Sequence, residues 1–109
     1  MIIERIGISA PDGRKQQMGS ALVSLTGPTH VQAGCLGCRL FQNWQEPYEF
    51  LIEAEWAAEG DLIRHLQSDT YKQLLLLMEL SPRPPVVQFY TVQDVRALDL
   101  VQEARNSLN

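Results

Sequence analysis

Three side chains in the second half of the chain, Trp56, His65 and Tyr71, are the ones best suited to chemistry. Histidine ionises near neutral pH and suits a general base. The other histidine, His30, falls in a predicted loop. The Trp56 indole could form an aromatic wall beside His65, and the Tyr71 phenol could donate a hydrogen bond. These residue types therefore allow proton transfer next to an aromatic ligand.

Each of these residues also has a structural interpretation, and the sequence leaves both open. His65 lies at the edge of the apolar stripe of its predicted helix, where a half-buried histidine commonly bonds a carbonyl group. Large aromatic side chains such as Trp56 anchor small cores, and the Tyr71 ring could pack while its hydroxyl meets water. Asn43 could donate to an oxyanion, but asparagine is also favoured at hairpin ends for turn geometry.

The elements that must position these residues follow from apolar periodicity and from breaker residues. Strands are predicted over residues 2–9, 36–44, 48–56 and 86–92. Helices are predicted from Gly13, capped by Asp12, to a stop at Gly27-Pro28, and then over residues 59–66, 69–78 and 94–106. This order predicts one α+β domain over residues 1–109, a ferredoxin-like split βαβ with an added C-terminal helix.

The two central strands predict a sheet with two unlike faces. The even-numbered residues, which should face the helices, are Cys38, Leu40, Phe50, Ile52, Ala54 and Trp56. The opposite face combines charged side chains with Phe41 and Leu51. A mixed face of this kind is typical of a sheet buried against another subunit, so we expect a homodimer.

Composition excludes several classes of function. The formal net charge is −4 and the basic residues are scattered, which disfavours a nucleic-acid partner. The longest apolar run, Leu74 to Met78, is too short to span a bilayer. The N-terminus, Met-Ile-Ile-Glu-Arg, carries charge where a signal peptide needs an apolar run. We therefore expect a cytoplasmic protein without a membrane partner.

The two cysteines, Cys35 and Cys38, fall in or beside a predicted strand. Strand residues three apart point to opposite faces, so we expect no disulfide between them. No second pair of Cys or His completes a zinc site, and no metal is expected. The prediction is two buried, unreactive thiols.

Three blocks of residues match a known family. The first is Gly27-Pro28-Thr29 with Gly34-Cys35-Leu36-Gly37-Cys38-Arg39-Leu40. The second is Glu55-Trp56, His65-Leu66, Ser68-Asp69 and Tyr71. The third is Leu77-Met78-Glu79-Leu80-Ser81, Pro84-Pro85-Val86 and Phe89. Together they resemble the antibiotic biosynthesis monooxygenase family, and the third block resembles its quinol monooxygenase subgroup.

The resemblance implies a dimeric α+β barrel, in which two sheets pack face to face. It also implies a cofactor-free monooxygenase or oxidase of a quinol-like or polycyclic hydroxyaromatic substrate. Such a reaction needs an apolar pocket, a base for the phenolic proton and donors for the developing oxyanion. The expected catalytic residues are His65, Trp56 and Tyr71, and the expected substrate contacts are Leu40, Asn43, Phe50 and Leu75.

Two other functions within the family can be compared with the sequence. Haem-degrading members carry an Asn in the first strand and an axial His where Leu75 stands here, and leucine cannot ligate iron. The remaining alternative is a non-catalytic dimer that binds a small aromatic molecule or has a structural role. A reactive site predicts a closed pocket shared by Trp56, His65 and Tyr71. The alternative predicts that these side chains pack on each other without a cavity.

Overall fold

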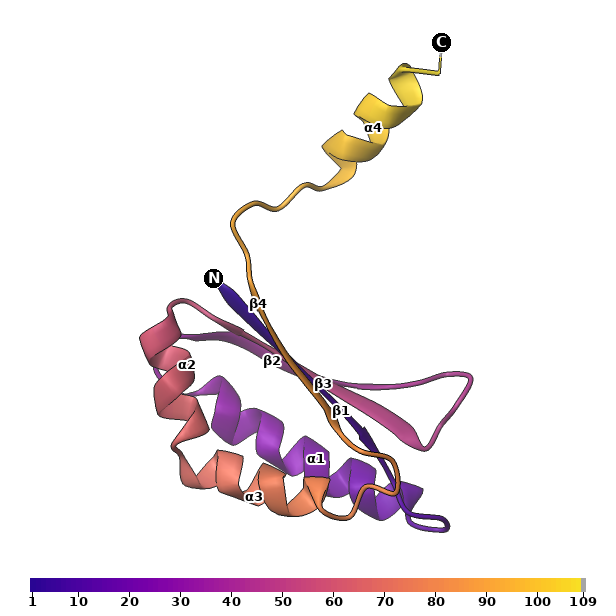
Figure 1. Cartoon of the computed structure of the whole chain (residues 1–109), viewed down its shortest axis with the longest axis vertical. Helices are drawn as coiled ribbons and strands as arrows, with labels where there is room; N and C mark the ends of the chain where they lie inside the picture. Colours follow the sequence, from indigo (N-terminus) through magenta and orange to yellow (C-terminus); the bar gives the residue numbers. More distant parts are fainter. Residues whose placement is uncertain (109) are drawn as a thin grey trace.

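The structure, a computed structural model, describes residues 1–108 as a sheet with helices on one face (Figure 1). The strands are β1 (Ile2–Ser9), β2 (Cys35–Gln42), β3 (Glu49–Trp56) and β4 (Val86–Thr91). The helices are α1 (Lys15–His30), α2 (Glu59–Leu66), α3 (Asp69–Met78) and α4 (Leu98–Asn106). This confirms the expected α+β, ferredoxin-like order, with two helices between β3 and β4.

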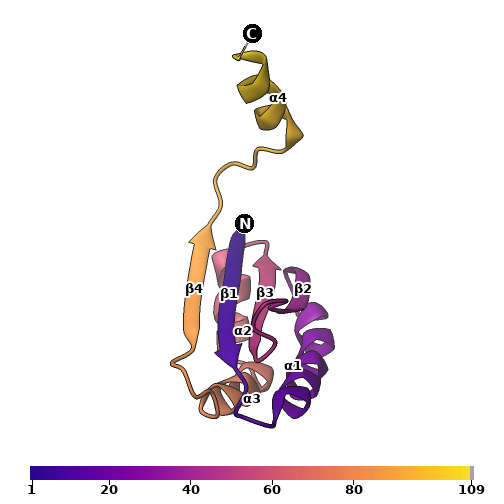
Figure 2. The same ribbon diagram turned by 90° about the vertical axis from the view of Figure 1, so that its right-hand side faces the viewer.

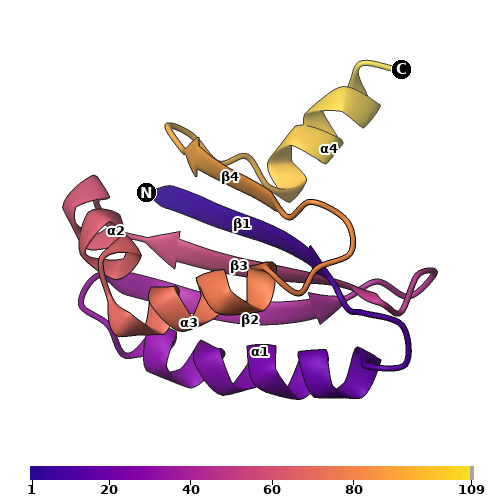
Figure 3. The same ribbon diagram turned by 60° about the horizontal axis from the view of Figure 1, so that its bottom comes forward.

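The sheet has the strand order β2-β3-β1-β4, and every neighbouring pair is antiparallel (Figure 2). Helices α1, α2 and α3 all lie against one face of the sheet (Figure 3). The core therefore fills the space between this face and the three helices. Any site built from sheet and helix residues must lie in the same layer.

The pairing of β2 with β3 has the predicted register. Leu40 lies opposite Ile52, and Phe41 lies opposite Leu51. Alternation therefore directs the even-numbered residues of β3 to the helices, where Trp56 has 0% of its surface exposed. The main core cluster comprises Ile6, Ile8, Ala10, Met18, Leu22, Leu25, Phe50, Ile52, Tyr71, Leu74 and Met78. A smaller cluster comprises Ile2, Ala54, Trp56 and Leu62.

Helix α1 differs from the prediction at both ends. It begins after Gly13, whose φ of +74° lies outside the helical region. It continues through Gly27-Pro28 to His30. A proline ring clashes with the Cβ of the preceding residue in a helix, and Gly27 has no Cβ. Thr29 is buried under the sheet and anchors this last turn in the core.

A β-bulge overturns the expected divergence of the two cysteines. The register shifts between Cys35 and Gly37, so Cys35 lies opposite Trp56 and Cys38 opposite Ala54. Both thiols are therefore on the helix-facing side, because the bulge adds one residue to β2. Both are free, and both are partly buried. Burial, followed by the nearby Cys35 and Glu4, raises the pKa of Cys38 to about 12. This thiol stays protonated, and hence poorly nucleophilic, at neutral pH.

The face of the sheet opposite α1, α2 and α3, which we call the outer face, carries both apolar and charged side chains. Its members are Ile3, Arg5, Arg39, Phe41, Leu51, Glu53, Glu55 and Tyr90. Phe41 is 45% exposed, and Arg5 Nε lies 3.3 Å from a carboxylate oxygen of Glu53. The outer face therefore has the mixed character that the sequence predicts.

Helix α4 lies apart from the rest of the chain (Figure 1). It begins at Leu98, later than the predicted residue 94, and contains no buried residue. Its apolar side chains Leu98, Leu100 and Val101 are exposed. Among residues 1–108, no helix combines the length and the hydropathy needed to cross a membrane.

Candidate active site

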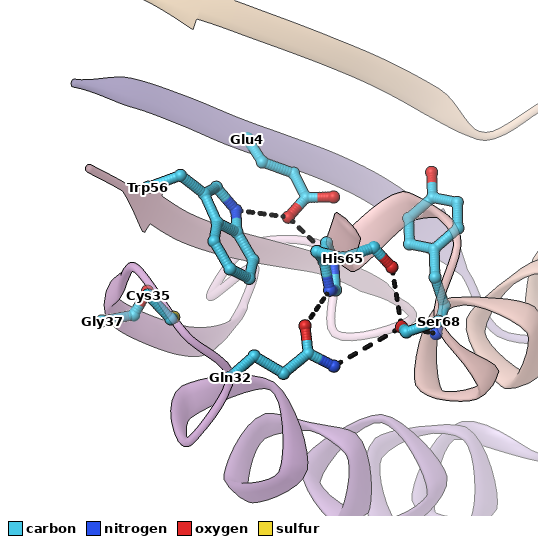
Figure 4. Close-up of polar contacts among 8 residues, drawn as sticks. Glu4, Gln32, Cys35, Gly37, Trp56, His65 and Ser68 are labelled. Carbon is cyan, nitrogen blue, oxygen red and sulfur yellow. Dashed lines mark hydrogen bonds and ion pairs between the residues drawn. The ribbon is translucent and has the colours of Figure 1, made fainter. Parts of the chain in front are cut away.

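A cluster of polar side chains is buried at the end of the sheet near α2 (Figure 4). Glu4 comes from β1, Trp56 from the end of β3 and His65 from α2, while Gln32 follows α1. Glu4 is 1% exposed and His65 is 3% exposed. A buried carboxyl group or imidazole is costly unless it is paired, so the contacts within this cluster determine its chemistry.

One oxygen of Glu4 and both ring nitrogens of His65 have partners. Trp56 Nε1 donates to Glu4 Oε1 at 3.1 Å, and His65 Nε2 lies 3.3 Å from the same oxygen. On the other side of the ring, His65 Nδ1 lies 2.8 Å from Gln32 Oε1. Figure 4 shows the three contacts as a continuous chain from β3 to the end of α1.

Ser68 determines where the protons in this chain lie. Its hydroxyl caps α3, accepting from Tyr71 N at 3.2 Å, and donates to the carbonyl of His65 at 2.6 Å. It also accepts from Gln32 Nε2 at 3.4 Å. Because the amide nitrogen of Gln32 faces Ser68, its oxygen faces His65, and His65 Nδ1 must carry a proton. His65 Nε2 then faces Glu4 Oε1, 3.3 Å away.

Two aromatic rings enclose the Glu4–His65 pair. The Trp56 ring stacks on His65 with centroids 4.5 Å apart and an interplanar angle of 27°. The Tyr71 ring meets His65 edge-on at 5.3 Å and 76°. Burial, with a smaller contribution from Glu4, raises the pKa of Tyr71, so its phenol stays protonated. The three predicted catalytic side chains therefore lie together, but they pack directly against one another.

A small cavity lies beside the pair. Its lining residues are Glu4, Leu25, Thr26, Thr29, Cys38, Ile52, His65, Thr70 and Leu74. The cavity offers about 10 Å³, enough for roughly one water molecule. The second oxygen of the carboxyl group, Glu4 Oε2, is buried and has no hydrogen-bond partner. Glu4 Oε2 can therefore accept a further hydrogen bond.

The four predicted substrate contacts lie away from this cavity. Asn43 is in the β2–β3 turn, where its Oδ1 accepts from the backbone nitrogens of Gln45 and Glu46 at 2.9 and 3.2 Å. Leu40 and Phe50 pack in or against the main core, and Leu75 is 47% exposed on α3. Asn43 thus serves the turn geometry, and none of the four lines the space beside His65.

Glu4 and Gln32 are not among the residues that the sequence predicts for the site. Glu4 did leave a signal, because it occupies an even position of β1 between Ile2 and Ile6, on the face that packs under the helices. A charged residue in a buried stripe must find a partner. Gln32 left no signal, because it lies outside any regular element. Within residues 1–108, no group of three His, Cys, Asp or Glu side chains is placed to share a metal ion.

Several solved structures of known proteins have a similar fold. A structure from Deinococcus radiodurans has a TM-score of 0.80, with 21% identity over 89% of this chain and 97% of the other. A structure from Nitrosomonas europaea has a TM-score of 0.77, with 13% identity over 86% of this chain and 100% of the other. The names of both assign them provisionally to the antibiotic biosynthesis monooxygenases. A conserved protein from Methanosarcina mazei has a TM-score of 0.75, with 23% identity over 85% of this chain and 94% of the other.

These structural similarities, all below 25% identity, show the shared fold. In sequence, no curated protein matches the chain. The model of the family described as antibiotic biosynthesis monooxygenase matches residues 1–75, which include β1, α1, the central hairpin and the whole Glu4–His65 cluster. The chain therefore belongs to the antibiotic biosynthesis monooxygenase family.

Proposed function

We propose that the protein is a cofactor-free monooxygenase or oxidase of a quinol-like hydroxyaromatic substrate. The observation that carries this proposal is the Glu4–His65 pair, a carboxyl group and an imidazole that are buried together against two aromatic rings. Family membership supports the same class of reaction. In a dry site, a fixed pair of this kind can accept a phenolic proton with little reorganisation.

The proposed reaction balances without a further redox partner. A quinol loses two protons and two electrons to become a quinone. In an oxidase, dioxygen takes up both and leaves as hydrogen peroxide. In a monooxygenase the substrate itself supplies four electrons, as when the CH2 group of an anthrone becomes a carbonyl group. One oxygen atom enters the substrate, and the other leaves as water with the two hydrogens. In both cases the protein must first remove a phenolic proton, because the anion passes its electron to dioxygen far more readily than the neutral phenol.

Oxygen uptake tests this function directly. In sealed, metal-free buffer, the protein with a naphthoquinol or anthrone should consume oxygen at least about tenfold faster than the substrate with heat-denatured protein. Quinols oxidise spontaneously, so the denatured blank is subtracted at every pH and concentration. Quinone, peroxide and consumed oxygen are measured together to separate oxidase from monooxygenase. Rates equal to the blank across a panel of quinols and anthrones would contradict the proposal.

A second candidate function is a non-catalytic binding or structural protein of the same fold. It is favoured by the direct packing of Trp56 and Tyr71 on His65, and by the engagement of both imidazole nitrogens. This is the arrangement expected if these residues form core rather than a pocket. It predicts binding of a small aromatic molecule, or none, without oxygen uptake above the blank.

We propose, further, that the protein forms a homodimer through the outer face. Phe41 is 45% exposed there beside charged side chains, a combination that suits an interface better than open water. The apolar residues of helix α4 are exposed. In the dimer, they would add to the interface by packing against the other subunit. The second subunit would then supply the second sheet of the α+β barrel that the family resemblance implies.

Sedimentation should therefore give a dimer at micromolar concentration. Phe41→Glu, which places a charge on the β2 side of the outer face, should weaken the dimer at least about tenfold. Val23→Glu is the matched control, because Val23 is similarly exposed but lies on α1, away from the outer face. A monomeric parent, or equal effects of the two substitutions, would contradict the proposed interface.

A further inference from the structure

We infer that Glu4 Oε2 is the atom that binds the hydroxyl group of a ligand and takes its proton, and that the ligand enters between α1 and α3. This inference rests on the proposed function and identifies the reacting atom within that site. It also transfers the role of base from His65, the residue that the sequence favours, to Glu4.

The two oxygens of Glu4 have different surroundings. Oε1 is held by Trp56 Nε1 at 3.1 Å and by His65 Nε2 at 3.3 Å. Oε2 is buried without a hydrogen-bond partner. Buried polar atoms without a partner are uncommon in folded proteins, and a carboxylate oxygen is a strong acceptor. The free oxygen is therefore ready to accept a hydrogen bond from a molecule in the adjoining cavity.

The cavity beside Glu4 extends from this carboxyl group to helices α1 and α3. On the helices, its buried lining residues are Leu25, Thr29, His65 and Leu74. Thr26 on α1 and Thr70 on α3 also line it, and both are partly exposed. The side of the cavity nearest the surface therefore lies between these two helices, and Glu4 and His65 lie at the inner end. A hydroxyaromatic ligand would enter with its hydroxyl group leading.

His65 is not free to act as the base in this arrangement. Its Nδ1 donates to Gln32 at 2.8 Å, and its Nε2 faces Glu4. When the imidazole holds both protons, Glu4 is a carboxylate whose Oε1 is fixed and whose Oε2 is available. His65 then acts as a positioning residue, since it orients the carboxylate and balances its charge.

The proton step follows from this state. The O–H bond of the substrate breaks and a bond forms between the proton and Glu4 Oε2, leaving the substrate as an oxyanion. After electrons pass from the substrate to dioxygen, the neutral Glu4 returns the proton to the reduced oxygen species. The cavity has room for roughly one water molecule, so an aromatic ring can approach only when α1 and α3 separate.

Glu4→Gln tests the role of this oxygen, because the amide keeps an acceptor for Trp56 and His65 but puts an NH2 group in place of Oε2. The probe is 4-nitrophenol, whose absorbance distinguishes phenol from phenolate. The parent should bind it with a shift toward the phenolate spectrum. Glu4→Gln should raise its Kd about 10–100-fold, the effect of losing a hydrogen bond to a charged group, and should lose the shift. Its kcat for quinol oxidation should fall about 10²–10⁴-fold.

Two further variants complete the experiment. Glu79→Gln, an exposed carboxylate at the end of α3, is the matched control and should change neither Kd nor kcat. Thr70→Trp should block entry between α1 and α3 and prevent binding while leaving the Glu4–His65 pair intact. Leu76→Trp, on the same helix and 56% exposed, should bind like the parent. If Glu4→Gln does not fold, the shift toward the phenolate spectrum in the parent tests the proton transfer, and the Thr70→Trp comparison tests the entry route.

The outcomes separate this inference from the proposed function. Probe binding that depends on Glu4, without oxygen uptake by the parent, supports the inference and contradicts the oxygenase. Oxygen uptake that persists in Glu4→Gln supports the oxygenase and overturns the inference. A parent that does not bind the probe, or a Thr70→Trp protein that binds it as tightly as the parent, also overturns the inference.

Discussion

Replacing Trp56 by alanine should lower the free energy of unfolding by about 3–5 kcal/mol, the range for a large aromatic side chain removed from a core. Trp56 has no exposed surface, stacks on His65 at 4.5 Å and donates to Glu4. The substitution thus creates a cavity and removes a donor from a buried carboxyl group. Chemical denaturation at a fixed protein concentration measures the loss, since a dimer would make the stability concentration-dependent.

Trp56→Phe separates the two contributions. It keeps most of the ring but loses the indole N–H, so it should cost about 1–3 kcal/mol, the penalty for an unsatisfied buried polar group. If Trp56→Ala unfolds at the same denaturant concentration as the parent, the side chain is not packed as described. If Trp56→Phe costs nothing, the hydrogen bond to Glu4 does not contribute to stability.

His65→Leu should cost about 3–5 kcal/mol, because it leaves the carboxyl group of Glu4 buried without its partner on α2. Glu4 is 1% exposed and would keep only the hydrogen bond from Trp56. The double variant Glu4→Leu/His65→Leu should be far less unstable than the sum of the two single variants. Buried ion pairs can often be replaced together by apolar residues at little cost.

The double-mutant cycle therefore predicts a coupling energy of about 2 kcal/mol or more between Glu4 and His65. Glu79→Leu combined with His65→Leu is the control, since Glu79 lies exposed at the end of α3 and has no contact with the pair. Additive losses for Glu4 and His65, within about 0.5 kcal/mol, would show that the two groups do not interact.

The sequence predicted most of the fold because alternation in the strands is a strong, local signal. The positions of Phe50, Ile52 and Trp56 on one face of β3 followed from the period of two residues, and the structure has this register. The sequence also identified His65 and Tyr71 as neighbours of Trp56. These three side chains come from consecutive elements, β3, α2 and α3, so their proximity depends on short connections.

The errors arose where long-range pairing determines local structure. The bulge that turns Cys35 and Cys38 to one face depends on how β2 aligns with β3. The passage of α1 through Pro28 depends on the burial of Thr29 under the sheet. Gln32 reaches His65 only after α1 has packed against the sheet. Glu4 is different, since its position in a buried stripe was visible, but its partner lies 61 residues away along the chain.

The isolation of α4 has a consequence for how the chain folds. A nine-residue helix without buried contacts is marginal in water, because the cost of nucleating it is not repaid by packing. If a second copy of the chain covers its apolar side chains, the helix acquires its stability only on association. Helical content would then fall on dilution together with the dimer, and amide protons in α4 would exchange at a rate set by protein concentration.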